Sequence, residues 1–129
     1  MERKWIIAGL LLLITGIALG AFGAHALKDL IADPGKLVIF ETGVRYQLLH
    51  AIGFLIVPFV ARHYAVNTKW IFRFLLAGVL CFSVSLYMLS LKGLLEIPEF
   101  RFFGPVTPLG GLLMILGWTA LLVHVMRKR

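Results

Sequence analysis

The sequence predicts an all-α integral membrane protein, a four-helix bundle, and three observations support this fold class. Hydrophobic residues make up 60% of the 129 residues and charged residues only 15%, with a mean hydropathy of +0.95. Soluble domains average roughly 25% charged residues. The apolar residues gather in four runs, and charged residues flank each run. Helical runs of ~20 residues match the ~30 Å hydrocarbon core of a bilayer.

The four expected spans cover residues 5–24, 46–61, 74–91 and 108–126 of a single transmembrane domain, residues 1–129. Helix is the required structure, because backbone polar groups find no water partner in lipid. The second span is short, and the sequence before it predicts a helix that starts near residue 36, after Pro34 and Gly35.

The charged flanks predict the orientation of the chain. If the helices alternate, one side of the membrane receives eight basic residues and one acidic residue, a sum equal to the formal net charge of +7. These residues are Arg3, Lys4, Arg62, Lys69, Arg73, Arg127, Lys128 and Arg129, with Glu2. The other side is neutral, with Lys28, Lys36, Arg45, Lys92 and Arg101 against Asp29, Asp33, Glu41, Glu96 and Glu99. Basic excess in short loops marks the cytoplasmic side. We therefore expect a multi-pass membrane protein with both termini in the cytoplasm.

The first apolar run raises the question of a cleavable signal peptide, because "AHA" at 24–26 fits a cleavage site. Its apolar stretch is longer than the roughly 7 to 15 residues of a signal sequence. We expect this run to remain as the first helix.

Polar residues from all four helices are predicted to lie at one level in the outer half of the bundle. Intramembrane polar residues mark functional sites, but they also join helices by hydrogen bonds, so both interpretations stay open. Glu41 and Arg45 are four residues apart and are expected to neutralise each other. The candidate cluster for ligand binding or structure comprises His25, Glu41, Arg45, Tyr46, Gln47, His50, Ser85, Tyr87 and Thr107.

Small residues are expected to mediate close helix packing, since they let a neighbouring backbone approach. The candidates are Gly9, Gly16, Gly20, Gly23, Ala24, Gly110 and Gly111. Thr107 and Pro108 are expected to be the N-cap and first residue of the fourth helix. Trp5, Tyr64 and Trp70 suit an aromatic belt at the inner interface, and Tyr87 suits one at the outer interface.

The sequence offers little support for a bound metal or cofactor. The single cysteine, Cys81, excludes an intramolecular disulfide, and no cluster of three or four metal ligands is apparent. His25 and His50 at the outer level, with His63 and His124 at the inner level, leave a two-haem b-type cytochrome as a remote alternative. We expect no cofactor, no metal site and no catalytic residue.

Four patches resemble one family. They are "GAFGAHALK" at 20–28, "FETGVRYQLLHAIGFL" at 40–55, "SLYMLSL" at 85–91 and "TPLGGLLMILGW" at 107–118. In this order they are similar to DUF423, also called UPF0382, a family of uncharacterised small bacterial membrane proteins related to the transmembrane protein 256 group. The resemblance implies a small multi-helix inner-membrane protein and no particular activity.

These observations favour a non-enzymatic binding or accessory protein. Its polar cluster would hold a lipid head group, a small amphiphile or a partner subunit. The alternative is a small transporter or ion-conducting oligomer that uses the same cluster. Membrane lipids, a second copy or another membrane protein are the expected partners. Nucleic acid is not, because the basic residues are scattered and form no motif.

Overall fold

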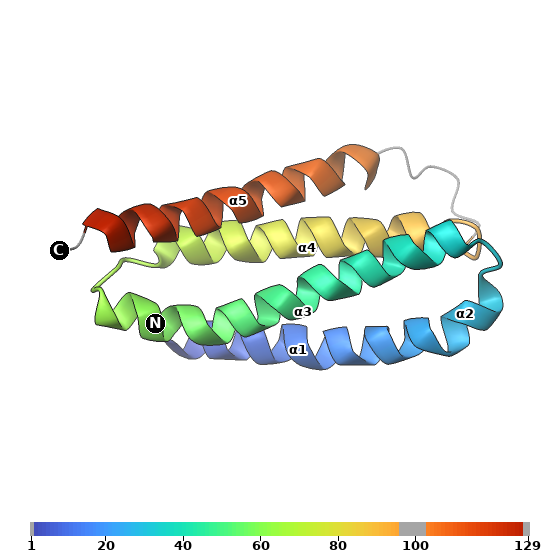
Figure 1. Ribbon diagram of the computed structural model, residues 1–129, viewed down its shortest axis with the longest axis horizontal. Helices are drawn as coiled ribbons and strands as arrows, with labels where there is room; N and C mark the ends of the chain where they lie inside the picture. The colour runs from blue at the N-terminus through green and yellow to red at the C-terminus, as the bar shows by residue number, and fades with distance from the viewer. Residues whose placement is uncertain (1, 96–102, 128–129) are drawn as a thin grey trace.

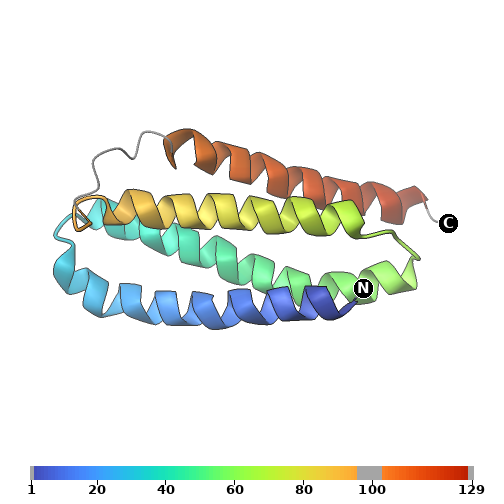
Figure 2. The same cartoon turned by 180° about the vertical axis from the view of Figure 1, so that it is seen from behind.

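The computed structural model describes residues 2–95 and 103–127, and these form four long helices and one short helix, with no strand. The helices are α1 (Glu2–Ala24), α2 (Ala26–Leu30), α3 (Pro34–His63), α4 (Lys69–Leu91) and α5 (Phe103–Arg127). The long helices run side by side and alternate in direction, and the spatial order follows the chain: α1, α3, α4, α5 (Figure 1; Figure 2). The predicted all-α four-helix fold is confirmed.

The two ends of the bundle differ. α1 begins and α5 ends at one end, the terminal end, whereas α2 lies at the other, the α2 end (Figure 1). The terminal end carries basic residues from all four long helices: Arg3, Lys4, Arg62, Lys69, Arg73 and Arg127. Of the other charged residues used to predict orientation, Glu96, Glu99, Arg101, Lys128 and Arg129 lie outside the described residues.

All four long helices are long and apolar enough to cross a membrane. Large apolar side chains also cover the outside of the bundle, where Phe59 and Met126 are each 70% exposed. Such a surface is stable only where lipid replaces water. The chain is a multi-pass membrane protein.

The start of α3 follows from its sequence. The side chain of Asp33 caps the helix by accepting a hydrogen bond from the Gly35 N–H at 2.9 Å, and Pro34 occupies the first turn. Proline suits this place because its missing N–H would have no partner there. With 30 residues, α3 extends roughly 45 Å, beyond the hydrocarbon core.

The expected start of the fourth long helix at Thr107 and Pro108 is wrong. α5 begins at Phe103, so Pro108 lies inside the helix and Thr107 does not cap it. The Thr107 hydroxyl instead donates to the carbonyl oxygen of Phe103 at 3.2 Å and lies 2.6 Å from the Ser85 hydroxyl of α4. A threonine can satisfy its hydroxyl against the preceding helical turn in this way, so it need not mark a helix start.

Glycines set the spacing of the helices. A Cβ at Gly16 of α1 would lie 2.7 Å from Cδ2 of Leu48 on α3, and a Cβ at Gly23 would lie 2.9 Å from the Phe40 ring. Gly9 and Gly20 face α3 as well, whereas Ala24 is exposed. The α1–α3 contact therefore depends on the absence of side chains along one face of α1.

The contact between α4 and α5 is closer still. A Cβ at Gly110 would lie 2.5 Å from the backbone nitrogen of Phe82 and 2.8 Å from the carbonyl oxygen of Gly78. The neighbouring Gly111 differs, since its nearest atoms are in the Phe82 ring at 3.9 Å. Backbone meets backbone at Gly110 but not at Gly111.

An aromatic cluster fills the core near the terminal end. Trp5 is 1% exposed, with ring centroids 4.9 Å from Phe54 and 5.0 Å from Phe72, and its indole N–H donates to the Thr68 hydroxyl at 3.2 Å. The interpretation of Trp5 as an interfacial belt residue is therefore wrong, because buried rings and a hydroxyl acceptor draw it inside.

Candidate functional site

The residues of the predicted polar cluster fall into two groups. Gln47, His50, Ser85 and Tyr87 are buried in the bundle, and Thr107 is half-buried beside them. His25, Glu41, Arg45 and Tyr46 are exposed on the outside. The two groups have different surroundings and different chemical capacity.

Gln47 of α3 joins three helices. Its Nε2 donates to the carbonyl oxygen of Leu12 at 2.9 Å and to the Thr15 hydroxyl at 2.8 Å, both on α1. Its Oε1 accepts the Tyr87 hydroxyl of α4 at 2.7 Å. An amide nitrogen has two donors, and both are used. Gln47 has no N–H left for a ligand.

The orientation of this amide follows from its partners. The Leu12 carbonyl can only accept, so the atom facing it must be the nitrogen, and the Tyr87 hydroxyl then meets the oxygen. Tyr87 is thus an interior residue, 7% exposed, rather than part of an interfacial aromatic belt.

His50 of α3 is also fully engaged. Its Nδ1 lies 2.8 Å from the carbonyl oxygen of Tyr46, and its Nε2 accepts the Trp118 indole N–H of α5 at 3.1 Å. A carbonyl only accepts and an indole only donates, so the proton sits on Nδ1 and the imidazole is neutral. His50 links α3 to α5 and offers no free nitrogen to a metal.

Serines complete the interior contacts. Ser83 donates to the carbonyl oxygen of Gly43 at 2.8 Å, and Ser85 bonds to the Phe82 carbonyl and the Thr107 hydroxyl. Sequence reasoning missed Thr15, Ser83 and Trp118 as partners. The available signal for Thr15 and Ser83 was a polar residue in the middle of an apolar run.

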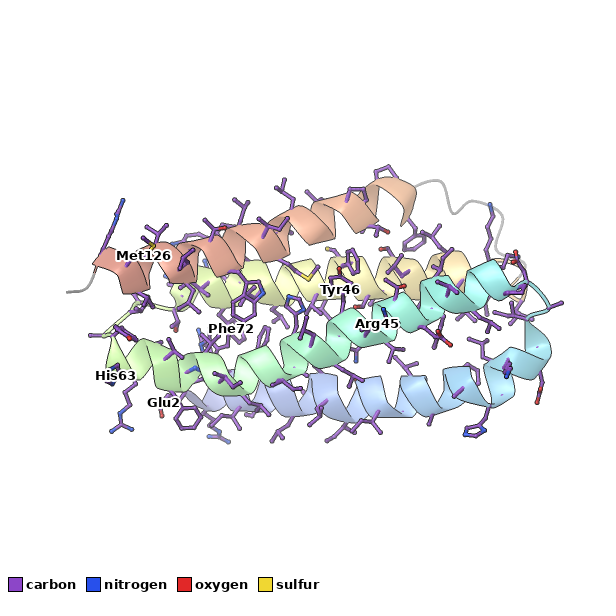
Figure 3. The ribbon with its side chains drawn as sticks, in the orientation of Figure 1. Glu2, Arg45, Tyr46, His63, Phe72 and Met126 are labelled. Carbon is purple, nitrogen blue, oxygen red and sulfur yellow. The ribbon has the colours of Figure 1, made fainter. Side chains whose placement is uncertain are left out.

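The exposed charged residues line a groove between α1 and α3. This α1–α3 groove has a volume of about 350 Å³ and is lined by Gly20, Gly23, Phe40, Glu41, Val44, Arg45 and Leu48. Arg45 and Tyr46 are adjacent on α3, and Tyr46 turns toward α4, where its ring lies 4.6 Å from that of Phe82 (Figure 3).

The expected ion pair between Glu41 and Arg45 is not formed, although both residues belong to the described part of the chain. An exposed pair four residues apart gains little free energy from contact, so the two side chains are free to meet other groups. Arg45 and Glu41 therefore present one charge of each sign beside the groove.

No two of the four histidines contact each other in the described part of the chain. His25 is exposed at the turn between α1 and α2, without a side-chain hydrogen bond to the cap of α2. His50 is occupied by Trp118 and Tyr46, while His63 and His124 are exposed. Within residues 2–95 and 103–127, no three potential metal ligands gather. This arrangement gives no support to a bis-histidine haem site.

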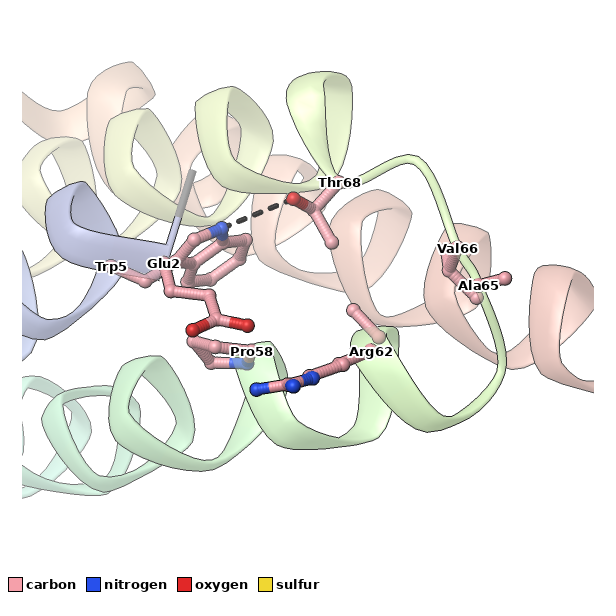
Figure 4. A pocket seen from close by; sticks show the side chains of 8 residues that line it. Glu2, Trp5, Pro58, Arg62, Ala65, Val66 and Thr68 are labelled. Carbon is pink, nitrogen blue, oxygen red and sulfur yellow. Dashed lines mark hydrogen bonds between the residues drawn. The ribbon is translucent and has the colours of Figure 1, made fainter.

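A further pocket of about 250 Å³ opens at the terminal end. Trp5, with its hydrogen bond to Thr68, forms one wall, and the Glu2 and Arg62 side chains lie beside Pro58 (Figure 4). Its position among the basic residues suits contact with anionic head groups.

Comparison with known proteins finds a family whose sequence pattern matches most of this chain. The family described as "Protein of unknown function (DUF423)" matches residues 19–111. The chain belongs to the DUF423 family. The matched region holds the α1–α3 groove together with Gln47, His50 and Tyr87.

Two curated relatives match almost the whole chain. The UPF0382 membrane protein SH2409 of Staphylococcus haemolyticus is 35% identical over 125 residues, 97% of each chain. The UPF0382 membrane protein YwdK of Bacillus subtilis is 34% identical over 130 residues, 97% of this chain and 98% of its own. No solved structure matches. The predicted membership of DUF423 is confirmed.

Proposed function

We propose that this DUF423 protein is a non-enzymatic lipid-binding protein that holds one glycerophospholipid in the α1–α3 groove. The observation that carries the proposal is the pair of exposed, unpaired charges, Glu41 and Arg45, beside a groove with apolar walls. The lipid phosphate meets Arg45, and an acyl chain follows the groove toward the membrane interior.

The depth of the charges supports a head-group contact. Gly20 faces Val44, the residue before Arg45, and Gly23 faces Phe40, the residue before Glu41. Arg45 therefore lies level with Gly20, four residues or roughly 6 Å from the end of α1. A long arginine side chain reaches the interface from that depth. Glu41 lies at the last turn of α1.

The shape of the groove favours a lipid chain. Gly20 and Gly23 provide no side chains on the α1 side, and Phe40, Val44 and Leu48 make the α3 side apolar. The volume of about 350 Å³ lies at the lower end of the ~300 to 1,000 Å³ range of small-molecule pockets. This space suits part of one chain and a head group.

The interior polar residues do not support a transport path. The amide N–H groups of Gln47 and both ring nitrogens of His50 are already hydrogen-bonded within the protein. Nearer the terminal end, the described core is filled by Trp5, Phe54, Ile71 and Leu75. The interior side chains act as a scaffold that fixes α3, and α3 presents the groove.

The test is lipid retention on purified protein. The protein is extracted with its native lipids in a mild detergent, and bound lipid is counted by native mass spectrometry. We expect Arg45→Gln and Gly20→Leu, which fills the groove, to retain one glycerophospholipid fewer per chain than the original protein. Arg73→Gln, an exposed arginine on α4, is the matched control and should keep the lipid. Equal retention in Arg45→Gln and Arg73→Gln would overturn the proposal.

A further inference from the structure

A second pocket lies at the α2 end, where α2 ends, α3 begins and α4 ends. This α2-end pocket has a volume of about 260 Å³, and its lining includes Leu30, Ile31, Asp33, Lys36, Ser90 and Leu94. It shares no lining residue with the α1–α3 groove. Helix ends place it at the head-group level of the membrane rather than in the hydrocarbon core.

Ser90 is the unusual residue of this pocket. It is 1% exposed, and its hydroxyl is the buried side-chain polar atom that lacks a hydrogen-bond partner within residues 2–95 and 103–127. Ser83 and Ser85 on the same helix both have partners. A buried hydroxyl without a partner costs free energy that a ligand atom can recover. The unpaired hydroxyl of Ser90 therefore indicates a ligand that places a polar atom beside it.

The charges of the pocket define the chemistry of that ligand. Lys36 lies over the turn after α4, since a Cβ at Gly93 would be 3.2 Å from its Nζ. Asp33 uses Oδ1 to cap α3, which leaves its other carboxylate oxygen for a second donor. One positive and one negative group disfavour a bare anion or a bare cation, because each would meet a like charge. A ligand that carries both signs satisfies both.

We propose that the α2-end pocket binds a phosphoethanolamine zwitterion. Its phosphate accepts hydrogen bonds from the Ser90 hydroxyl and the Lys36 ammonium, and its primary ammonium donates to the Asp33 carboxylate. Such charge-assisted hydrogen bonds are stronger than neutral ones. The small volume fits the head group, while the exposed Leu30 and Leu94 at the rim suit the start of lipid chains. The head group comes from a membrane lipid or from a soluble phosphodiester.

The experiment titrates the whole protein in detergent micelles with three compounds and follows the midpoint of thermal unfolding. Phosphatidylethanolamine is the lipid source, glycerophosphoethanolamine is the soluble source, and phosphatidylcholine has no ammonium N–H. Binding to the folded state stabilises it by RT ln(1 + L/Kd), where L is the free ligand concentration, so the midpoint rises more at a given concentration for a tighter ligand. We expect phosphatidylethanolamine to raise it more than phosphatidylcholine. A response to glycerophosphoethanolamine supports the proposal with the head group alone sufficient, and a response only to the lipid supports it with the membrane as the source.

Four variants locate the site. Ser90→Ala and Lys36→Gln should each weaken the apparent affinity about tenfold through loss of a hydrogen bond to phosphate. Asp33→Asn, which can still cap α3, should remove the preference over phosphatidylcholine. Lys92→Gln, one residue past α4 and outside the pocket lining, is the matched control and should bind like the original chain.

The result that overturns the proposal is a set of curves in which Ser90→Ala and Lys36→Gln bind as well as Lys92→Gln, or in which no compound shifts the midpoint. Equal binding of the two lipids overturns it also. Without ligand, Ser90→Ala should unfold no earlier than the original chain, because it removes a hydroxyl that has no partner. Arg45→Gln should keep the preference for phosphatidylethanolamine over phosphatidylcholine, which separates this pocket from the proposed groove.

Discussion

Trp118 of α5 donates its indole N–H to Nε2 of His50 on α3 across 3.1 Å, and this bond fixes the protonation of the imidazole. The opposite nitrogen lies 2.8 Å from the Tyr46 carbonyl oxygen, so the ring is neutral with its proton on Nδ1. A histidine within a membrane helix is thus used to join helices that are not adjacent in the chain.

Replacing this histidine should destabilise the bundle. His50→Ala leaves the Trp118 indole without its acceptor, and we expect a loss of about 1 to 3 kcal/mol in the free energy of unfolding. The measurement is unfolding by denaturant in micelles, with Trp118→Phe and the double variant completing a cycle. If the two single losses simply add, the two residues do not interact and the bond is not formed in the membrane protein.

Gln47 should be more sensitive than Tyr87. Gln47→Leu removes the acceptor of the Tyr87 hydroxyl and the donor to the Leu12 carbonyl and the Thr15 hydroxyl, whereas Tyr87→Phe removes one hydrogen bond and keeps the ring. Membrane double-mutant cycles give about 0.6 kcal/mol per interhelical hydrogen bond, so we expect Tyr87→Phe near that value and Gln47→Leu at two to three times it. Equal losses of unfolding free energy in the two variants would contradict a three-helix junction at Gln47.

Adjacent glycines of α5 offer a matched pair. Gly110→Ala places a methyl group 2.5 Å from the Phe82 nitrogen and must push α4 and α5 apart, at a cost of about 1 to 3 kcal/mol. Gly111→Ala meets nothing closer than 3.9 Å and should be neutral or slightly stabilising. Thermal unfolding of both variants in the same detergent decides the matter, and similar midpoints would show that α5 is rotated about its axis.

The orientation of the chain stays a prediction that fusions can test. A C-terminal fluorescent protein that matures only in the cytoplasm should be bright, because the basic terminal end is expected to face inward. Alkaline phosphatase fused after Leu30, in the loop at the α2 end, should be active outside the cytoplasm. The opposite pattern of fluorescence and phosphatase activity would reverse the topology.

Much of the fold was predictable from the sequence because membrane insertion depends on local properties. Four apolar runs with charged flanks predict four helices, and a second helix that starts well before Tyr46 follows from the sequence around Pro34. The level of each polar residue along the bundle follows from the same reasoning. The start of α5 was not predictable, since the Thr107 hydroxyl that suggested an N-cap contacts Ser85 of another helix instead.

The sequence by itself determined the fold class and the family to which the chain belongs. Only the tertiary structure decided which polar side chains face the interior, where Gln47 and His50 are buried, and which face outward, where Glu41 and Arg45 flank a groove. The physical reason is that lipid is as apolar as the bundle core, so large apolar side chains of α1 form no hydrophobic stripe that marks its inner face. The depth of a residue in the membrane follows from its position along one helix. Whether its side chain faces the interior or the lipid depends on the neighbouring helices that pack against that helix.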